Sequence, residues 1–253
     1  TDAGLSASTS DLRGRESESL QAKGKYLATI GGCVSCHTQR GQAPMSGGRA
    51  IATPFGTVFS SNLSSSKPHG IGAWSLHDFE MALRWGRSAN GRLLMPVFPY
   101  NHTSLLTQGD VQAIYAWLQS LPASEQAVPA HQLTWPLGTQ PVIAVWRSLF
   151  FKPQAWQAPA GHSEAFARGA YLVQGLGHCA ACHGADGKGN QAIGAPNLTD
   201  DIWLHGSGES AIIERINHGK NNKMPAQGYR FTPEQIHVLA AYVWRFSNSD
   251  KVN

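Results

Sequence analysis

The stretch Gly175-Leu-Gly-His-Cys-Ala-Ala-Cys-His-Gly184 contains the signature Cys179-Ala-Ala-Cys182-His183. The same pattern of residue types occurs earlier, as Cys33-Val-Ser-Cys36-His37. Two thiols at this spacing can each bond to one vinyl group of a haem, and the His that follows then lies against the iron as its proximal ligand. The two signatures therefore predict two covalently attached haem c groups, with His37 and His183 as iron ligands.

A Cys-x-x-Cys pair also occurs in structural zinc sites, redox dithiols and disulfides. A zinc ribbon needs two such pairs close in sequence, whereas these pairs begin at Cys33 and Cys179. A redox dithiol does not explain why His follows both pairs. All four cysteines of the chain lie in the two signatures, so haem attachment is the better interpretation.

The composition fits a chain that wraps a flat cofactor. Among 253 residues, 27 are Gly, 14 are Pro and only 14% are charged, which is typical of short helices joined by long loops. A second repeat supports a duplicated unit, since Lys23-Gly-Lys-Tyr-Leu27 matches Arg168-Gly-Ala-Tyr-Leu172. We expect an all-α fold with a disordered lead-in at 1–14, a first domain at 15–128, a connector without a haem signature at 129–161, and a second domain at 162–253.

Apolar periodicity and capping residues predict where the helices lie. Ser75 and Thr107 are expected to cap two helices of the first domain. Short extended segments are expected between Thr53 and Leu63. The expected helices span about 16–30, 75–85, 107–121, 142–151, 162–175, 209–218 and 232–246.

Charge and hydropathy exclude some classes of partner. The formal net charge of +4 is offset by haem propionates, and no basic run alternates with aromatic residues, so we expect no nucleic-acid partner. No apolar run reaches the roughly 20 residues that a membrane span needs, and the nearest candidate, Pro141 to Phe151, is interrupted by Arg147. A chain that starts at Thr1 rather than Met suggests a processed or trimmed N-terminus.

An iron that only passes electrons is expected to have a second axial ligand. For the second haem this ligand is predicted to be Met224, because no other Met follows position 95. For the first haem two residues compete. Met95 repeats the Met-Pro step of Met224-Pro225 and is favoured, while His102 in the same loop is the alternative. A thioether ligand raises the reduction potential, whereas a second imidazole lowers it.

The second half resembles the C-terminal haem domain of the diheme subunit of cbb-type haem-copper oxidases. The resemblance rests on Gly194-Ala-Pro-Asn-Leu-Thr-Asp-Asp-Ile-Trp-Leu204, Met224-Pro-Ala226 and Pro233 to Val243, and it covers about residues 165–248. It implies a class I cytochrome c domain in which Met224 is the distal ligand. The expected fold is therefore two such domains in tandem.

The first part is similar to the multihaem cytochrome subunits of periplasmic dehydrogenases. The similarity rests on Phe55 to Leu63, Gly70-Ile-Gly-Ala-Trp-Ser75 and Asp110 to Leu118. In those subunits the distal Met usually lies in Pro-x-Met-Pro-Tyr, whereas here Leu93 replaces the first Pro and Val97 the Tyr. This departure keeps His102 as an alternative to Met95.

These resemblances imply a periplasmic carrier of single electrons that performs no substrate chemistry. The expected partners are a dehydrogenase or the quinol pool on one side and a terminal oxidase on the other, with both irons low-spin and six-coordinate. Two other classes remain open. A diheme peroxidase-type enzyme would need one iron with an open distal position, and a gas sensor would release Met95 or Met224 to admit carbon monoxide or nitric oxide.

Overall fold

The computed structural model describes residues 9–177, 179, 183–184, 186–190, 195–200 and 206–218. The chain forms two compact units, Thr1–Thr199 and Asp200–Asn253. Both haem signatures belong to the first unit. The domain boundary expected between residues 161 and 162 stays a prediction.

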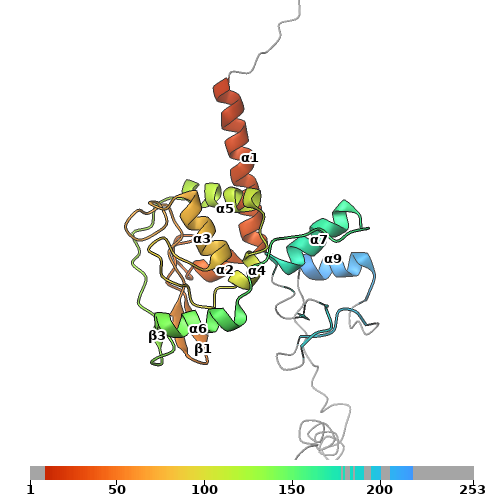
Figure 1. The fold of residues 1–253 in the computed structure, drawn as a ribbon. Coiled ribbons are helices and arrows are strands. Elements are labelled where there is room, and N and C mark those ends of the chain that lie inside the picture. Colours follow the sequence, from red (N-terminus) through yellow and green to blue (C-terminus); the bar gives the residue numbers. More distant parts are fainter. Residues whose placement is uncertain are drawn as a thin grey trace, which may run out of the picture. The chain divides into compact units, whose positions relative to one another are not determined.

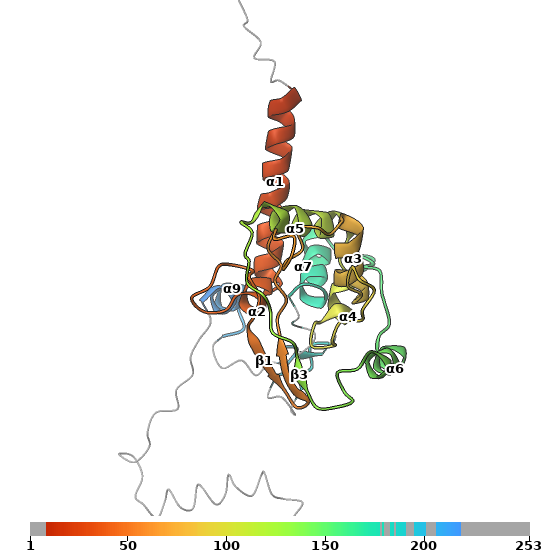
Figure 2. The same ribbon diagram turned by 90° about the vertical axis from the view of Figure 1, so that its left-hand side faces the viewer.

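The long helix α1 (Thr9–Ile30) crosses α5 (Gln108–Ser120) in the first unit (Figures 1 and 2). It begins at Thr9, before the expected start near residue 16. A Cβ atom at Gly24 would lie only 1.9 Å from the carbonyl oxygen of Ala113. The two helices can therefore approach this closely only because residue 24 is glycine. Leu27, one turn further on, is fully buried in the core.

Two expected helix starts are confirmed by their caps. At α3 (Leu76–Trp85), the backbone N–H of Asp78 donates to Ser75 Oγ, and the Asp78 carboxylate accepts from the Ser75 N–H. At α5 the Thr107 hydroxyl accepts from the Asp110 N–H. Such caps satisfy N–H groups that have no partner within the helix. The two helices bury their apolar faces, which include Phe79 and Val111, in one shared core. This core consists mainly of Leu27, Ala28, Ile71, Phe79, Leu83, Leu106, Val111, Ala113, Ile114, Trp117, Leu118, Tyr171 and Leu176.

The expectation of an all-α fold is wrong in one respect, because the first unit contains a small antiparallel sheet. Of the hairpin β1 (Ala50–Thr53) and β2 (Gly56–Phe59), β2 falls where extended segments were expected, whereas β1 lies before that range and reaches it only at Thr53. The third strand, β3 (Gln132–Leu133), comes from the predicted connector and pairs with β2. The connector is thus joined to the first unit through backbone hydrogen bonds.

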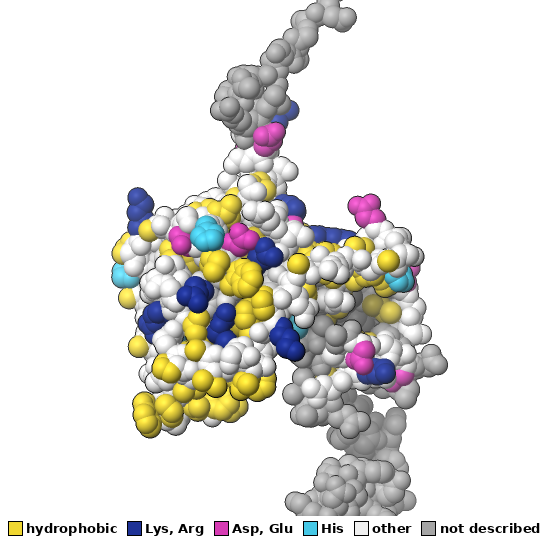
Figure 3. All heavy atoms as spheres, in the orientation of Figure 1, with side chains coloured by type: hydrophobic (Ala, Val, Ile, Leu, Met, Phe, Trp, Pro, Cys, Tyr) yellow, Lys and Arg dark blue, Asp and Glu magenta, His cyan; other side chains and the backbone are white. Residues whose placement is uncertain are grey.

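The helix of the connector, α6 (Gln140–Phe150), is amphipathic. Ile143 is 3% exposed, while Val145, Leu149 and Phe150 are each at least 60% exposed. Figure 3 shows hydrophobic side chains gathered at the end of the first unit where α6 and β3 lie. On the inner side the Arg147 guanidinium lies over the ring of Tyr100, 5.1 Å from its centroid. The inward residues of α6 therefore fix the connector against the loop that carries Met95 and His102.

Helix α7 (Glu164–Gln174) lies where a helix was expected to open the second domain. Its N-cap Ser163 accepts a hydrogen bond from the Phe166 N–H. In the second unit α9 (Glu209–His218) matches the expected span. The expected helix at 232–246 lies outside the described residues. In the part of the chain that the structure describes, every helix is too short or too polar to cross a membrane.

Candidate haem sites

The first signature forms a short helix, α2 (Cys33–His37). Residues at positions i, i+3 and i+4 share one face of a helix, so the helix places Cys33, Cys36 and His37 on the same face. Gly32 precedes it with φ of 63°, a left-handed conformation that glycine adopts without strain. The turn at Gly32 thus allows α2 to start directly after α1 ends.

The thiols of the first signature are not joined in a disulfide. Burial raises the pKa of the Cys33 thiol to about 11. Both free thiols lie on one face of α2, as attachment of a single group to Cys33 and Cys36 requires.

The His37 ring is oriented by the backbone. Its Nδ1 atom lies 2.8 Å from the carbonyl oxygen of Ser61. A carbonyl only accepts, so Nδ1 carries the hydrogen and Nε2 carries the lone pair, which is the tautomer that can bind iron through Nε2. Burial also lowers the pKa of the His37 imidazole, which favours the neutral form that a metal ligand requires.

The histidine of the second signature is oriented in the same way. The Nδ1 atom of His183 lies 2.8 Å from the carbonyl oxygen of Pro196. Cys179 is exposed, and its thiol is not in a disulfide. Cys182 lies outside the described residues, as does Met224. The part of this site that is described therefore presents the Nε2 lone pair of His183 in the same way as the first site presents that of His37.

A repeated frame of backbone hydrogen bonds surrounds the histidines of both signatures, His37 and His183. Gly47 N–H donates to the His37 carbonyl at 2.8 Å, and Gly189 N–H donates to the His183 carbonyl at 2.8 Å. A Cβ at either glycine would come within 2.6 Å or less of the facing backbone. Both glycines are therefore required by the close approach of the loop that orients the histidine.

A second pair of contacts completes the frame. In the first site Asn62 Oδ1 accepts from the Ser64 N–H at 3.0 Å, and in the second Asn197 Oδ1 accepts from the Thr199 N–H at 2.8 Å. Sequence reasoning did not pair these residues, although Asn62-Leu-Ser64 and Asn197-Leu-Thr199 are similar tripeptides. That tripeptide repeat is the signal that could have located the frame.

The two frames differ at one position, which is Met45 in the first site and Gly187 in the second. Leu63 N–H donates to the Met45 carbonyl, and the corresponding Leu198 N–H donates to Gly187. Met45 has φ of 62° and Gly187 has φ of 71°. Glycine adopts this left-handed backbone more readily than methionine. The Met45 side chain is fully buried, so its packing offsets the strain of the backbone.

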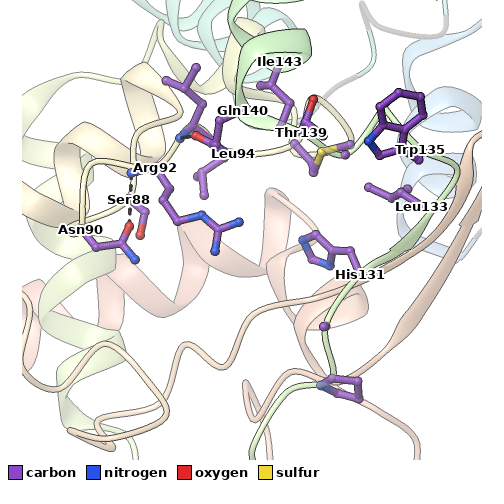
Figure 4. Close-up of a pocket in the computed structure, with 15 residues that line it drawn as sticks. Ser88, Asn90, Arg92, Leu94, His131, Leu133, Trp135, Thr139, Gln140 and Ile143 are labelled. Atoms are coloured by element: carbon purple, nitrogen blue, oxygen red, sulfur yellow. Dashed lines mark hydrogen bonds between the residues drawn. The ribbon is translucent and has the colours of Figure 1, made fainter.

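Met95 lines a cavity of about 520 Å³ (Figure 4). The connector supplies much of its wall, including His131, Leu133 and Trp135, and the loop before Met95 supplies Arg92. Residues of α2 are not among those that line this cavity. Met95 therefore lies near the connector. The residues that line this cavity include none from the first signature.

The connector also fixes the loop before Met95. The Gln140 side chain accepts from the Leu93 N–H at 2.7 Å and donates to the Leu93 carbonyl at 3.2 Å. One side-chain amide thus satisfies both backbone groups of Leu93, as a neighbouring strand would. Gln140 is a positioning residue that the sequence did not indicate.

His131 is a further histidine that sequence reasoning missed. Burial, together with the charge of Arg92, lowers its pKa. The Phe59 N–H donates to His131 Nδ1 at 3.2 Å, so Nδ1 is the acceptor and Nε2 carries the hydrogen in the neutral ring. This tautomer is the opposite of that of His37 and His183, and it does not present an Nε2 lone pair.

The alternative ligand, His102, lies in the short helix α4 (Tyr100–Thr103). Its Nδ1 atom is 3.1 Å from the carbonyl oxygen of Gln174, the last residue of α7. The ring therefore has the same tautomer as His37 and His183. It is brought together with a segment that leads into the second signature, a contact that no sequence pattern indicated.

The two copies of the repeated motif, Lys23 to Leu27 and Arg168 to Leu172, both contact the same carboxylate. Asp110, whose side chain is 4% exposed, lies 2.7 Å from Lys23 Nζ and 3.3 Å from Arg168 Nη1. Lys23 and Arg168 occupy the same position of the motif. Tyr171 of the same helix accepts from the Thr107 N–H at 3.0 Å. Helix α7 is thereby attached to the start of α5.

Comparison with known proteins gives one matching family model. Residues 164–243 match the family described as cytochrome C oxidase, cbb3-type, subunit III. The match contains the second signature and Met224. Over 74 residues the chain is also 61% identical to the cbb3-type cytochrome c oxidase subunit CcoP of Rubrivivax gelatinosus, which is 29% of this chain and 24% of that protein.

Longer matches extend over the first part of the chain. The cytochrome c subunit of alcohol dehydrogenase (quinone) from Gluconacetobacter polyoxogenes is 34% identical over 258 aligned positions, covering 88% of this chain and 55% of that one. The diheme cytochrome c-type protein of Cereibacter sphaeroides is 35% identical over 187 positions, covering 70% and 63%. The chain spans 55% of the length of the first of these relatives and 63% of the length of the second. On these matches it is a cytochrome c that resembles both the cytochrome c subunits of dehydrogenases and the haem domain of the cbb3-oxidase subunit.

Proposed function

We propose that this protein is a periplasmic diheme cytochrome c that carries single electrons and performs no substrate chemistry. The observation that carries the proposal is the duplicated frame, in which His37 and His183 each donate from Nδ1 to a backbone carbonyl 2.8 Å away. An iron ligand needs this orientation and tautomer, whereas a surface histidine does not. Two such frames, each attached to a Cys-x-x-Cys-His signature, support two haem sites.

The residues of the chain fit haem c at both sites. Cys33 and Cys36 would hold the first group, Cys179 and Cys182 the second, with His37 and His183 as proximal ligands. Met224 is the proposed distal ligand of the second haem, and the loop of Met95 and His102 supplies that of the first. When bound, the haem iron supplies a one-electron couple. The protein orients the ligands and limits access of water, and electron transfer requires little further movement.

The names of the relatives suggest the redox partners. One relative is the cytochrome c subunit of a quinone-linked alcohol dehydrogenase, and another is a subunit of a cbb3-type oxidase. We infer that the first part of this chain receives electrons from a dehydrogenase or the quinol pool and that the second part passes them to a terminal oxidase. The contacts with such partners are expected to be small and short-lived, because a carrier must dissociate quickly.

The test is to express the protein with the haem-attachment machinery and to measure its intact mass. The mass should exceed that of the polypeptide by two haem groups. Replacing Cys33 and Cys36 together by Ser should remove one group, and replacing Cys179 and Cys182 together should remove the other. Surface Ser148→Ala is the control and should retain both. An unmodified mass, or rapid turnover of hydrogen peroxide by the loaded protein, would contradict the proposal.

A further inference from the structure

His102 is held rigidly in the loop that follows Met95. Its neighbour Tyr100 is 1% exposed, and the Thr103 hydroxyl donates to the Leu83 carbonyl. The ring Nδ1 lies 3.1 Å from the carbonyl oxygen of Gln174. Both the backbone of α4 and the ring of His102 are therefore fixed by neighbouring residues.

The contact with Gln174 repeats the device found at both proximal histidines. His37 and His183 also donate from Nδ1 to a backbone carbonyl, at 2.8 Å in each case. In all three rings the Nε2 atom is the one that carries the lone pair. His131, by contrast, accepts at Nδ1 from the Phe59 N–H. The tautomer thus separates His102 from His131 and groups it with the two proximal ligands.

The position of His102 also relates it to the first signature. A Cβ at Gly31 would lie 2.9 Å from Leu176 Cδ2 and 3.5 Å from Cys33 Sγ. Leu176 is two residues after Gln174, whose carbonyl accepts from His102. The three-residue segment 174–176 therefore contacts both His102 and Gly31, which lies two residues before the first signature. Met95 instead lines a cavity whose wall contains no residue of α2.

We propose that His102 Nε2 is the sixth ligand of the first haem iron and that the Gln174 carbonyl is the group that orients it. The proposal rests on the proposed function, because it assigns a ligand within one of the two haem sites. It makes the first haem bis-histidine and the second His/Met. It also links the two sites, since the helix that orients His102 ends five residues before Cys179.

The test compares three forms of the haem-loaded protein: wild type, Met95→Leu and His102→Gly. The measurements are low-temperature electron paramagnetic resonance and the near-infrared methionine-to-iron band of the oxidised protein, both of which distinguish bis-His from His/Met iron. In the wild type we expect a methionine band from one of the two haems only. Met95→Leu should keep both spectra unchanged. His102→Gly should convert one haem, half of the total, to a form whose ferrous state binds carbon monoxide.

Rescue distinguishes a ligand from a structural residue. Added imidazole should restore the bis-nitrogen signal of His102→Gly, because it can occupy the vacated coordination site, and a residue that only supports folding would show no such rescue. A methionine band from both haems in the wild type, lost from one of them in Met95→Leu, would overturn the assignment and leave the proposed function intact. A haem that is high-spin in the resting wild type would overturn both.

Discussion

At the scale of single residues, Asp110 is a buried carboxylate that pairs with two cations, Lys23 and Arg168. Burial raises the pKa of its carboxyl, but hydrogen bonds and charges from Lys23, Tyr171 and Arg168 outweigh burial and hold the pKa below its ordinary value. The two cations are about half exposed, whereas the carboxylate is almost fully buried. Removing the carboxylate charge therefore leaves two cations without their common partner.

Asp110→Asn is expected to lower the free energy of unfolding by about 2 kcal/mol at pH 7, less than for a fully buried pair because the cations reach water. Because the folded pKa is depressed, this contribution is present above the unfolded value of about 3.9 and is lost as the pH falls through the folded pKa. The difference between wild type and variant should therefore shrink below about pH 4. Urea unfolding at pH 7 and at lower pH measures it.

The matched control is Asp186→Asn, because Asp186 is exposed and its Lys188 partner is 3.9 Å away. An exposed pair of this kind contributes little, so the control should change stability by less than about 0.5 kcal/mol. Equal stability of wild type and Asp110→Asn at pH 7 would show that the three-way contact does not stabilise the protein.

At the scale of elements, the connector is part of the first haem unit. β3 extends the hairpin, and α6 holds the loop before Met95 through the two hydrogen bonds between Gln140 and Leu93. Ile143 and Arg147 bury the inner face of the same helix. A segment without a haem signature thus determines the position of the loop that is proposed to supply the distal ligand of the first haem.

Gln140→Ala should lower stability by about 1 to 2 kcal/mol, since each of the two hydrogen bonds contributes about 1 kcal/mol. The Leu93 amide loses its acceptor, so its hydrogen exchange should accelerate more than that of the Leu94 amide, which donates to Gly86 instead. Gln140→Glu keeps the acceptor and loses the donor, and its Leu93 amide should remain protected. Ser148→Ala, on the exposed side of α6, is the control. Unchanged exchange of the Leu93 amide in Gln140→Ala would show that the Gln140 side chain does not hold the Leu93 backbone.

At the scale of the whole molecule, local features could be predicted from the sequence and long-range ones could not. The caps at Ser75 and Thr107 depend on residues three positions apart, so the pattern contains the whole signal. The pairing of β3 with β2 depends on backbone groups of a two-residue strand, which has no periodicity to detect. The contact of His102 with Gln174 likewise joins residues 72 positions apart and uses a carbonyl that every residue possesses.

The segment before the second signature also contributes to the core of the first unit through a contact that is distant in sequence. Leu176, which precedes the second signature, is 2% exposed and lies against Gly31, two residues before the first signature. Leu176→Ala should therefore lower the free energy of unfolding by about 3 kcal/mol, the cost of removing a buried leucine and leaving a cavity. Val173→Ala, at a position of α7 that is 46% exposed, should cost less than about 0.5 kcal/mol. If Leu176 did not pack into the core of the first unit, neither variant would affect the first haem. If they share a core, Leu176→Ala should also shift the absorption spectrum of the first haem in urea at a lower concentration than in the wild type, and Val173→Ala should not.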